Sequence, residues 1–492
     1  RTLFSIGFFD RPTSQPDDSL IDKPAHAAAA QKVEESAITL LKNGGALPLD
    51  ASKLKSIAVI GPDANKFVTG GGSGNVTPFS AVTALDGIKA RAGSGVQVTS
   101  ADGSDATAAA ATAKAADVAV VVVGDYETEG ADRQCLTLEC PNSNGDQDGL
   151  IQSVAAAQPN TIVVLETGGP VLTPWRDKVK ALVETWYPGE SGGTAIARVL
   201  FGDVDPGGRL PVTFPEKEAD LPTAGDPSRY PGDASGDVHY SEGVLMGYRW
   251  YDAKKLAPAY PFGFGLSYTS WRYGPVTVTP SGDGSSGAKV SFKVTNTGSR
   301  AGTEVPQLYL SMPQPSADVV QPPRQLKNYR KVSLAPGKTT RVTLPIDTRA
   351  LSYWDTAAQA WAVAPGCYGI GVGRSSRDIV GSAALAVRTA SCGGPVGLPS
   401  TRRCVDRRKF TFKLHRAPHA RVVRVEGFVN GKRKVNRRGH DIKRVTLRRL
   451  PRGKFKVKIV ATQNTGSTLT STRTYRGCKK SRPSTRAHHS SG

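Results

Sequence analysis

The residues best suited to chemistry stand in one short segment, residues 124–133, which reads GDYETEGADR. The segment holds four carboxylates and one arginine, and it directly follows a strongly apolar run. Cleavage of a glycosidic bond needs a carboxylic acid that protonates the leaving oxygen and a second carboxylate across the sugar. A loop glutamate could supply that acid if enclosure against a partner domain raised its pKa. On residue types alone, a solvated acidic surface loop is the more common alternative.

An alternation of helix and strand patterns surrounds this segment and would position it. Val118–Val123 is a continuous apolar run, as found in strands that are buried on both faces. Helices are expected over 27–41, 82–90, 105–116, 148–157 and 193–200, and strands over 56–60, 96–99, 118–123, 161–166 and 181–186. Such alternation predicts an α/β sandwich with a mainly parallel sheet. Ligand chemistry in these sheets gathers beyond the carboxyl ends of the strands, which is where the acidic segment falls.

The second half of the chain has the patterns of all-β domains. Residues 203–270 are rich in Gly, Pro and aromatic residues and are expected to form a long wrapped connection, and residues 280–288 a turn or linker. Period-two runs at 290–294, 307–311, 340–345 and 368–372 predict a β-sandwich. Further β patterns at 421–429 and 454–461, with the hairpin signal Asn430-Gly431, predict an extra small β domain. The expected fold class is therefore a multidomain α/β plus all-β protein.

Charge is distributed unevenly along the 492 residues. The net charge is +22, but residues 391–492 alone hold 28 Lys and Arg against 3 acidic residues. Residues 1–390 hold 36 basic and 39 acidic residues and are close to neutral. A basic tail has therefore been joined to a near-neutral protein, and the two parts need separate explanations.

The basic tail is dense enough in cations to bind polyanions in a salt-dependent way. It lacks interleaved aromatic residues and any zinc or helix-turn-helix pattern, so we expect no nucleic-acid partner. An anionic cell-wall polymer is the expected partner. The alternative is a solvated β surface that aids solubility.

Six cysteines, an even number, are placed as pairs rather than as metal ligands. Cys135 could close a small ring with Cys140, and Cys367 and Cys392 stand at the start and end of two expected neighbouring strands. Cys404 and Cys478 bracket the basic tail. Six cysteines allow 15 pairings, and isolated thiols remain the alternative. Because no Cys/His spacing indicates zinc, we expect neither a metal nor a cofactor. Paired cysteines favour an oxidising compartment, so secretion is expected.

Several longer motifs occur together and in order over residues 1–390. They read RTLFSIGFFDRP at 1–12, AVIGPDAN at 58–65, GGGSGNVTP at 70–78, WYPGESGGTAIARVLFGDVDPGGRLPVTFP at 186–215 and YPFGFGLSYT at 260–269. This set resembles glycoside hydrolase family 3 in the portion that follows its N-terminal barrel. The resemblance implies an α/β sandwich followed by a fibronectin type III-like domain. It also implies a retaining, exo-acting, β-glucosidase-like hydrolase acting on a β-linked glucoside or oligosaccharide.

The resemblance also suggests roles for residues of the acidic segment. In the family the nucleophile is an Asp on the barrel, and the acid/base is a Glu on a loop of the α/β sandwich. EGADR at 129–133 matches the motif around that Glu, so Glu129 is the candidate acid/base, with Glu127 as the alternative. Asp132 and Arg133 are expected to hold the loop and to tune the pKa of the glutamate, the Arg lowering it and the acid raising it.

The resemblance has one large departure. The chain begins at Arg1, after the point where the barrel should end, so it offers no counterpart of the Asp nucleophile. A retaining mechanism needs two carboxylates about 5–5.5 Å apart, so we expect the chain alone to be catalytically incomplete. A fragment of a longer enzyme is the first explanation. A non-catalytic carbohydrate-binding or cell-surface protein is the alternative.

Other features are less specific. The glycines at 70–74 lack the following Lys and the spacing of a phosphate-binding loop, so a tight loop lining a sugar cleft is expected there. Trp186 and Tyr187 could stack on sugar or simply pack, and residues 248–252 are expected at a cleft rim or in the core. No apolar run is long enough to span a bilayer. The expected organisation is a linker from the barrel at 1–31, the α/β sandwich at 32–270, the fibronectin type III-like domain at 271–392, a linker at 393–403, the basic β domain at 404–480 and a disordered tail at 481–492.

Overall fold

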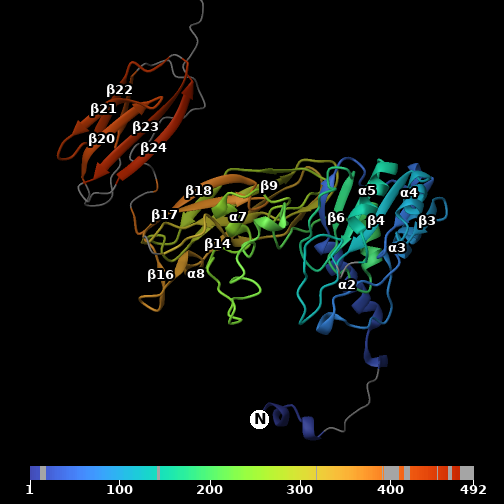
Figure 1. Cartoon of the computed structure of the whole chain (residues 1–492). Coiled ribbons are helices and arrows are strands. Elements are labelled where there is room, and N and C mark those ends of the chain that lie inside the picture. The colour runs from blue at the N-terminus through green and yellow to red at the C-terminus, as the bar shows by residue number, and fades with distance from the viewer. Residues whose placement is uncertain are drawn as a thin grey trace, which may run out of the picture.

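A six-stranded sheet forms the centre of the first domain (Figure 1). The computed structural model describes residues 1–10, 18–140, 144–316, 319–389, 392, 409–414, 421–451, 453–463 and 468–476. The sheet has the order β1-β6-β5-β4-β2-β3, and every neighbouring pair is parallel except β1 with β6. Its strands are β1 (Thr39–Asn43), β2 (Ser56–Ile60), β3 (Gln97–Ala101), β4 (Val118–Gly124), β5 (Thr161–Glu166) and β6 (Ala181–Glu184). The mainly parallel sheet expected from the sequence is confirmed.

Helices cover both faces of this sheet. They are α2 (Lys23–Ala37), α3 (Ala84–Ala92), α4 (Ala106–Lys114), α5 (Gln147–Ala157) and α6 (Gly192–Leu200). Every residue of β4 is buried, and its side chains alternate between two cores: Val118, Val120 and Val122 pack with α3 and α6, and the residues between them with α4 and α5. The apolar run therefore marks a strand sandwiched between helices on both sides.

The expected helix over 27–41 is wrong at its end. Helix α2 ends at Ala37, and the apolar residues that follow form the antiparallel edge strand β1. Ile38 and Leu40 are fully buried in the core shared with α6, so burial of this segment in the sheet overrides the helical spacing of the alanines before it.

The second domain is a β-sandwich of two four-stranded sheets. One sheet has the order β12-β11-β17-β18, and the other has β14-β9-β7 with β8 also paired to β9. The domain contains β7 (Trp271–Tyr273), β8 (Thr277–Pro280), β9 (Ala288–Asn296), β10 (Gly302–Glu304), β11 (Gln307–Ser311), β12 (Gln325–Tyr329), β13 (Val332–Leu334), β14 (Thr339–Ile346), α8 (Thr348–Leu351), β15 (Ser352–Asp355), β16 (Ala360–Val363), β17 (Gly366–Gly373) and β18 (Ile379–Val387). Inward-facing residues of both sheets share one core, which confirms the expected sandwich.

The connection between these two domains contains a short helix that the sequence patterns did not reveal. This helix, α7 (Tyr248–Lys254), carries Asp252, whose buried carboxylate pairs with Arg324 at 3.1 Å and Arg377 at 2.8 Å on the sandwich. The α/β domain is joined to the sandwich by another buried pair, Arg209 with Glu304 at 2.8 Å. The 248–252 segment therefore connects the two domains; of its five residues, expected at a cleft rim or in the core, Tyr251 is buried and the others are partly exposed.

The basic tail folds as a small β domain with its own core. A four-stranded sheet, β21-β20-β23-β24, packs against the two-stranded sheet β19-β22. The strands are β19 (Lys409–Lys413), β20 (Val422–Val429), β21 (Lys432–Arg438), β22 (Arg444–Arg448), β23 (Lys454–Gln463) and β24 (Thr468–Arg476). Asn430-Gly431 forms the turn between β20 and β21, both residues with positive φ, as expected for this hairpin.

Two of the three expected cysteine pairs lie among the described residues and are confirmed. Cys135 is bonded to Cys140 with Cα atoms 5.7 Å apart, and Cys367 to Cys392 with Cα atoms 5.3 Å apart. Cys404 and Cys478 lie outside the described residues, as do the expected linker at 393–403 and the expected tail at 481–492. In the part of the chain that the structure describes, no helix is long and apolar enough to cross a bilayer.

Candidate functional site

Residues 124–133, the acidic loop, leave β4 at the carboxyl edge of the parallel sheet. The neighbours of β4 are β2 and β5, and the loops that follow them flank the acidic loop. One is the glycine loop, residues 70–74, and the other is Gly168-Gly169 directly after β5. Three chain segments that are distant in the sequence are thus brought to one place by the order of the strands.

The base of the acidic loop is an ion cluster around Arg133. The guanidinium Nη1 donates to Asp125 at 2.5 Å, and Nε lies 3.0 Å from Oε1 of Glu127. Its Nη2 donates to the carbonyl of Pro170 at 3.0 Å. Arg133 and Asp125 are partly buried, with 15% and 8% of their side chains exposed, and Glu127 is 35% exposed. The arginine therefore ties the start of the loop to its end.

Tyr187 also contacts the base of the acidic loop. Its hydroxyl accepts a hydrogen bond from the backbone N–H of Glu127 at 2.8 Å and lies 3.2 Å from Oδ1 of Asp125. Gly168 donates its N–H to the same Asp125 oxygen at 2.9 Å. The tyrosine thus has a packing and positioning role here, and Trp186 beside it packs edge-on against Phe214.

The tip of the loop has a different environment. Glu129 is exposed, and its Oε2 accepts two hydrogen bonds from Ser73 of the glycine loop: one from the hydroxyl at 2.6 Å and one from the backbone N–H at 2.8 Å. A reversal of the chain at Gly130, where φ is 75°, presents this carboxylate at the end of the loop.

The glycine loop can approach so closely only because Gly71 and Gly72 lack side chains. A Cβ at Gly71 would lie 2.2 Å from Oγ1 of Thr128, and one at Gly72 would lie 2.5 Å from Oε2 of Glu129. The N–H of Gly71 also donates to the carbonyl of Glu127 at 2.8 Å. The glycines thus serve to support the acidic loop, and any larger residue would displace Glu129.

The pKa values of the two loop glutamates are shifted in opposite directions. Burial raises the pKa of Glu127, an effect that the charge of Arg133 partly offsets. The hydroxyl and N–H of Ser73 lower the pKa of Glu129 by bonding to its ionised form. At neutral pH Glu129 is therefore ionised in this chain. The raised pKa expected for an acid catalyst is not found, because the tip of the loop is open to solvent.

The two residues expected to support Glu129 have other partners. Arg133 contacts Asp125 and Glu127, so its charge lowers the pKa of Glu127 and not that of Glu129. Asp132 is exposed and hydrogen-bonds with Tyr230. The expectation that both tune Glu129 is therefore wrong. Arg133 still holds the loop, as expected, but from its base.

Two further glutamates stand near this edge, at the ends of β5 and β6. Glu166 is 2% exposed and Glu184 is fully buried, and burial raises the pKa of both well above the usual range. Glu184 accepts hydrogen bonds from Thr167 and from the backbone of Trp186. Burial thus disfavours the ionised form of both groups, and both lie in the protein interior rather than at the tip of the acidic loop.

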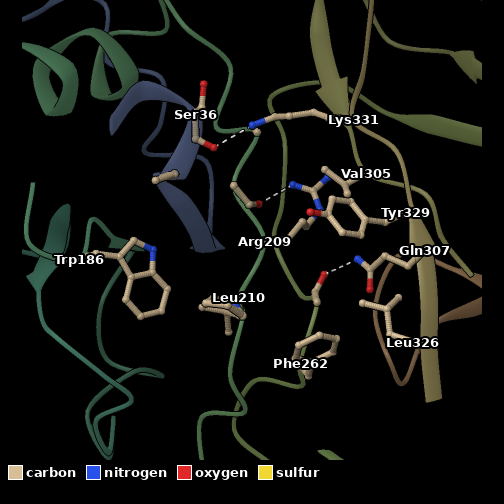
Figure 2. Close-up of a pocket in the computed structure, with 15 residues that line it drawn as sticks. Ser36, Trp186, Arg209, Leu210, Phe262, Val305, Gln307, Leu326, Tyr329 and Lys331 are labelled. Atoms are coloured by element: carbon tan, nitrogen blue, oxygen red, sulfur yellow. Dashed lines mark hydrogen bonds between the residues drawn. The ribbon is translucent and has the colours of Figure 1, made fainter. Parts of the chain in front are cut away.

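An apolar cavity of about 530 Å³ lies elsewhere, between the α/β domain and the β-sandwich (Figure 2). Figure 2 shows Trp186 on one side of it and Leu326, Gln307 and Tyr329 on the other. None of the described residues that line this cavity carries a carboxylate, the group that glycosidic cleavage requires. Among the described residues no group of three or more His, Cys, Asp or Glu is arranged to hold a metal ion. The acidic loop remains the candidate site.

The sequence did not indicate that Ser73, Asp125 and Tyr187 position the loop, although packing was one of the two roles expected of Tyr187. The order of the strands could have indicated that the glycine loop and Gly168-Gly169 lie beside the acidic loop. Both follow strands adjacent to β4, and the carboxyl ends of neighbouring parallel strands share one edge. The side-chain partners themselves depend on tertiary contacts that no local pattern encodes.

Comparison with protein families identifies two of the domains. Residues 38–268 match the glycosyl hydrolase family 3 C-terminal domain, and residues 304–376 match a fibronectin type III-like domain. The first match contains the complete acidic and glycine loops.

Individual relatives agree with these matches. Over 383 residues, 75% of this chain and 49% of the relative, the chain is 38% identical to thermostable beta-glucosidase B of Acetivibrio thermocellus. Over 393 residues, 75% of this chain and 50% of the relative, it is 38% identical to an exo-alpha-(1->6)-L-arabinopyranosidase of Bifidobacterium longum. A solved structure, the β-glucosidase DesR of Streptomyces venezuelae, has a TM-score of 0.72 and 34% identity, covering 78% of this chain and 63% of that one. The chain spans about half the length of the curated relatives it matches.

Proposed function

We propose that this chain, which carries the C-terminal domain of glycosyl hydrolase family 3, supplies the acid/base half of the active site of a retaining, exo-acting, β-glucosidase-like hydrolase. In this proposal the carboxyl of Glu129 protonates the leaving oxygen of the glycosidic bond and later removes a proton from the attacking water. The observation that carries it is the contrast within the acidic loop: Glu129 stands exposed at the tip, whereas Glu127 is bound to Arg133 at the base.

Ser73 and the base of the loop would position this acid/base. An acid catalyst must lie within hydrogen-bond reach of the oxygen that it protonates. Ser73 holds one oxygen of Glu129, which fixes the direction of the carboxylate and leaves Oε1 without a partner among the described residues. The cluster of Asp125, Glu127 and Arg133 keeps the loop from moving at its origin.

The second carboxylate would come from a barrel domain with an Asp nucleophile, packed over the tip of the loop. Enclosure by that domain would remove water from Glu129 and raise its pKa, opposing the effect of Ser73. The acid/base would then be protonated near neutral pH, as the first step of the reaction needs. Without such a partner the chain has an ionised Glu129 and no nucleophile, and we expect no turnover.

The substrate class in this proposal is a glycoside with a terminal β-linked glucose or a related sugar. One relative of equal similarity is named for an arabinopyranoside, so the degree of similarity over the matched portion does not fix the monosaccharide. The confirmed disulfides favour an oxidising compartment, and we propose that the protein is secreted.

Fusion of an Asp-bearing family barrel ahead of Arg1 tests this function. We expect the fused protein to hydrolyse an aryl β-glucoside and the chain alone to be inactive. A barrel with its Asp replaced by Ala is the matched control and should restore nothing. Hydrolysis by the unfused chain, or by the fusion with the Ala barrel, would contradict the proposal that the barrel supplies the nucleophile and this chain the acid/base.

If the fusion with the intact barrel is folded and inactive, the enzymatic proposal is wrong. The domains would then be better explained as a carbohydrate-binding or cell-surface protein.

A further inference from the structure

One face of the basic β domain is a continuous field of cations. On the four-stranded sheet β21-β20-β23-β24, alternate residues of each strand point to the core and the rest point away from it. The exposed cations of the outward side are what we name the cationic face: Arg433, Arg438, Lys454, Lys456, Lys458 and Arg476; Arg424, on the same side, is half-exposed. All six are exposed.

Strand register brings these cations together across the sheet. Lys454 is paired with Arg476 on β24, and Lys458 is paired with Phe428 on β20, which is itself paired with Arg433 on β21. Neighbouring strands lie about 4.8 Å apart, and alternate residues of one strand about 7 Å apart. Lys454, Lys456 and Lys458 therefore form a straight row about 14 Å long with further cations on both sides.

Most of this charge has no counterion among the residues that the structure describes. The acidic residue of this face, Glu426, is bound by Arg424 at 3.0 Å and by Arg433 at 3.2 Å. Within the described residues, Lys454, Lys456, Lys458, Arg438 and Arg476 form no ion pair. Mutual repulsion of such cations destabilises the folded domain, and a polyanion that released counterions on binding would relieve it.

The outward side of the sheet lacks two features that favour other polyanions: exposed aromatic rings for stacking single-stranded bases, and apolar side chains for insertion into a membrane. Proteins that bind single-stranded nucleic acid stack bases on exposed aromatic rings, but the aromatic residue of this face, Phe428, is only half-exposed, and Phe455 and Tyr475 point to the core. Insertion into a membrane interface uses exposed apolar side chains, and none of the large exposed hydrophobic residues of the described chain lies in this domain.

We propose that the cationic face binds an extended acidic polysaccharide, with the lysine row of β23 following the anionic groups of the polymer. A flat row with a regular spacing fits a linear chain that carries one charge on each sugar or pair of sugars. The domain is joined to domains of a glycoside hydrolase family, so binding would hold the protein at a carbohydrate surface. This proposal does not depend on the catalytic role of Glu129.

Titration of the full chain with polygalacturonate at 50 mM salt, with and without the variant K454Q/K456Q/K458Q, tests the proposal. We expect the variant to lose about tenfold or more in affinity and the dependence of log affinity on log salt to become shallower. The variant K454R/K456R/K458R keeps the charge and should keep the affinity. A circular dichroism melt of each variant checks whether the domain remains folded.

The matched control removes three cations from the opposite side of the same domain. Lys409, Arg444 and Arg448 are exposed and point outward from the sheet β19-β22. K409Q/R444Q/R448Q should change the affinity for polygalacturonate by less than about threefold. An equal loss in both triple variants would mean that net charge alone acts and would overturn the assignment to this face.

Competing polyanions decide the class of partner. We expect weaker binding to a single-stranded oligonucleotide and to vesicles of phosphatidylcholine with phosphatidylserine than to polygalacturonate, compared per anionic group. Tighter binding to either one, lost in K454Q/K456Q/K458Q, would overturn the assignment to a polysaccharide. Absence of binding to polygalacturonate would do so as well.

Discussion

The base and the tip of the acidic loop each carry a glutamate, but the two side chains lie in different environments. At the base, Glu127 is partly buried and paired with Arg133, and burial raises its pKa. At the tip, Glu129 is exposed and bound by Ser73, which lowers its pKa. Two residues of identical chemistry, separated by one threonine, therefore have opposite electrostatic environments.

This difference indicates that the structural role of the loop and its proposed catalytic role belong to different residues. A carboxylate that neutralises a buried arginine cannot release it without a large loss of stability, because an uncompensated charge would remain. A carboxylate held by a neutral serine can change its protonation state at little cost. The tip is thus free to take part in proton transfer while the base keeps the loop in place.

The base should respond most strongly to loss of its cation. We expect Arg133→Met to lower the free energy of unfolding of the α/β domain by about 3 kcal/mol, because Asp125 and Glu127 would lose their counterion. Urea unfolding followed by tryptophan fluorescence measures this loss, since Trp175 is buried in that domain.

Arg91 provides the matched control for that measurement. It pairs with Asp203 at 2.6 Å on the surface, where both side chains are about a third exposed, so Arg91→Met should cost less than about 1 kcal/mol. Equal losses for the two variants would show that the cluster at the base is no stronger than a surface ion pair.

The tip should respond to a smaller change at Ser73. In Ser73→Ala the carboxylate of Glu129 keeps one hydrogen bond, from the backbone, and loses the other, so its pKa should rise toward the ordinary value. Carbon NMR titration of the Glu side chains below and above pH 4.5 measures this rise in the pKa of Glu129. The measurement uses the chain without a fused barrel.

Glu127 is the internal control in the same spectra. Its pKa is raised in the wild-type chain, so it should titrate at a higher pH than Glu129 and should not move in Ser73→Ala. A Glu129 pKa that stays unchanged in this variant would mean that the serine does not hold the carboxylate in solution.

Much of the fold could be predicted from the sequence, because buried helices and strands have regularly spaced or continuous apolar residues. The Val118–Val123 run, the hairpin at Asn430-Gly431 and two of the cysteine pairs were recognisable and are confirmed. The end of α2 and the helix α7 were not predicted correctly. In both places, contacts with distant segments decide the conformation, as the burial of Leu40 and the pairs of Asp252 show.

The site was predictable only in part. The resemblance located the loop and ranked Glu129 above Glu127, but it assigned Arg133 to the wrong glutamate. Arg133 could reach either one from its place in the sequence, and its choice depends on Pro170 and Asp125, which bind it at the base. Ser73 lies 56 residues before Glu129, and no local pattern connects the two.

The central claim is that Glu129, and not Glu127, is the acid/base, and the barrel fusion allows its most direct test. We expect Glu129→Ala to lower kcat/KM for an alkyl β-glucoside by about 10²–10⁴-fold, with a much smaller loss for a dinitrophenyl β-glucoside, whose leaving group needs no proton. Azide, which attacks without a general base, should restore part of the turnover of the activated substrate. Glu127→Ala should show neither signature. If Glu127→Ala shows the leaving-group dependence and the azide rescue and Glu129→Ala does not, the assignment is wrong.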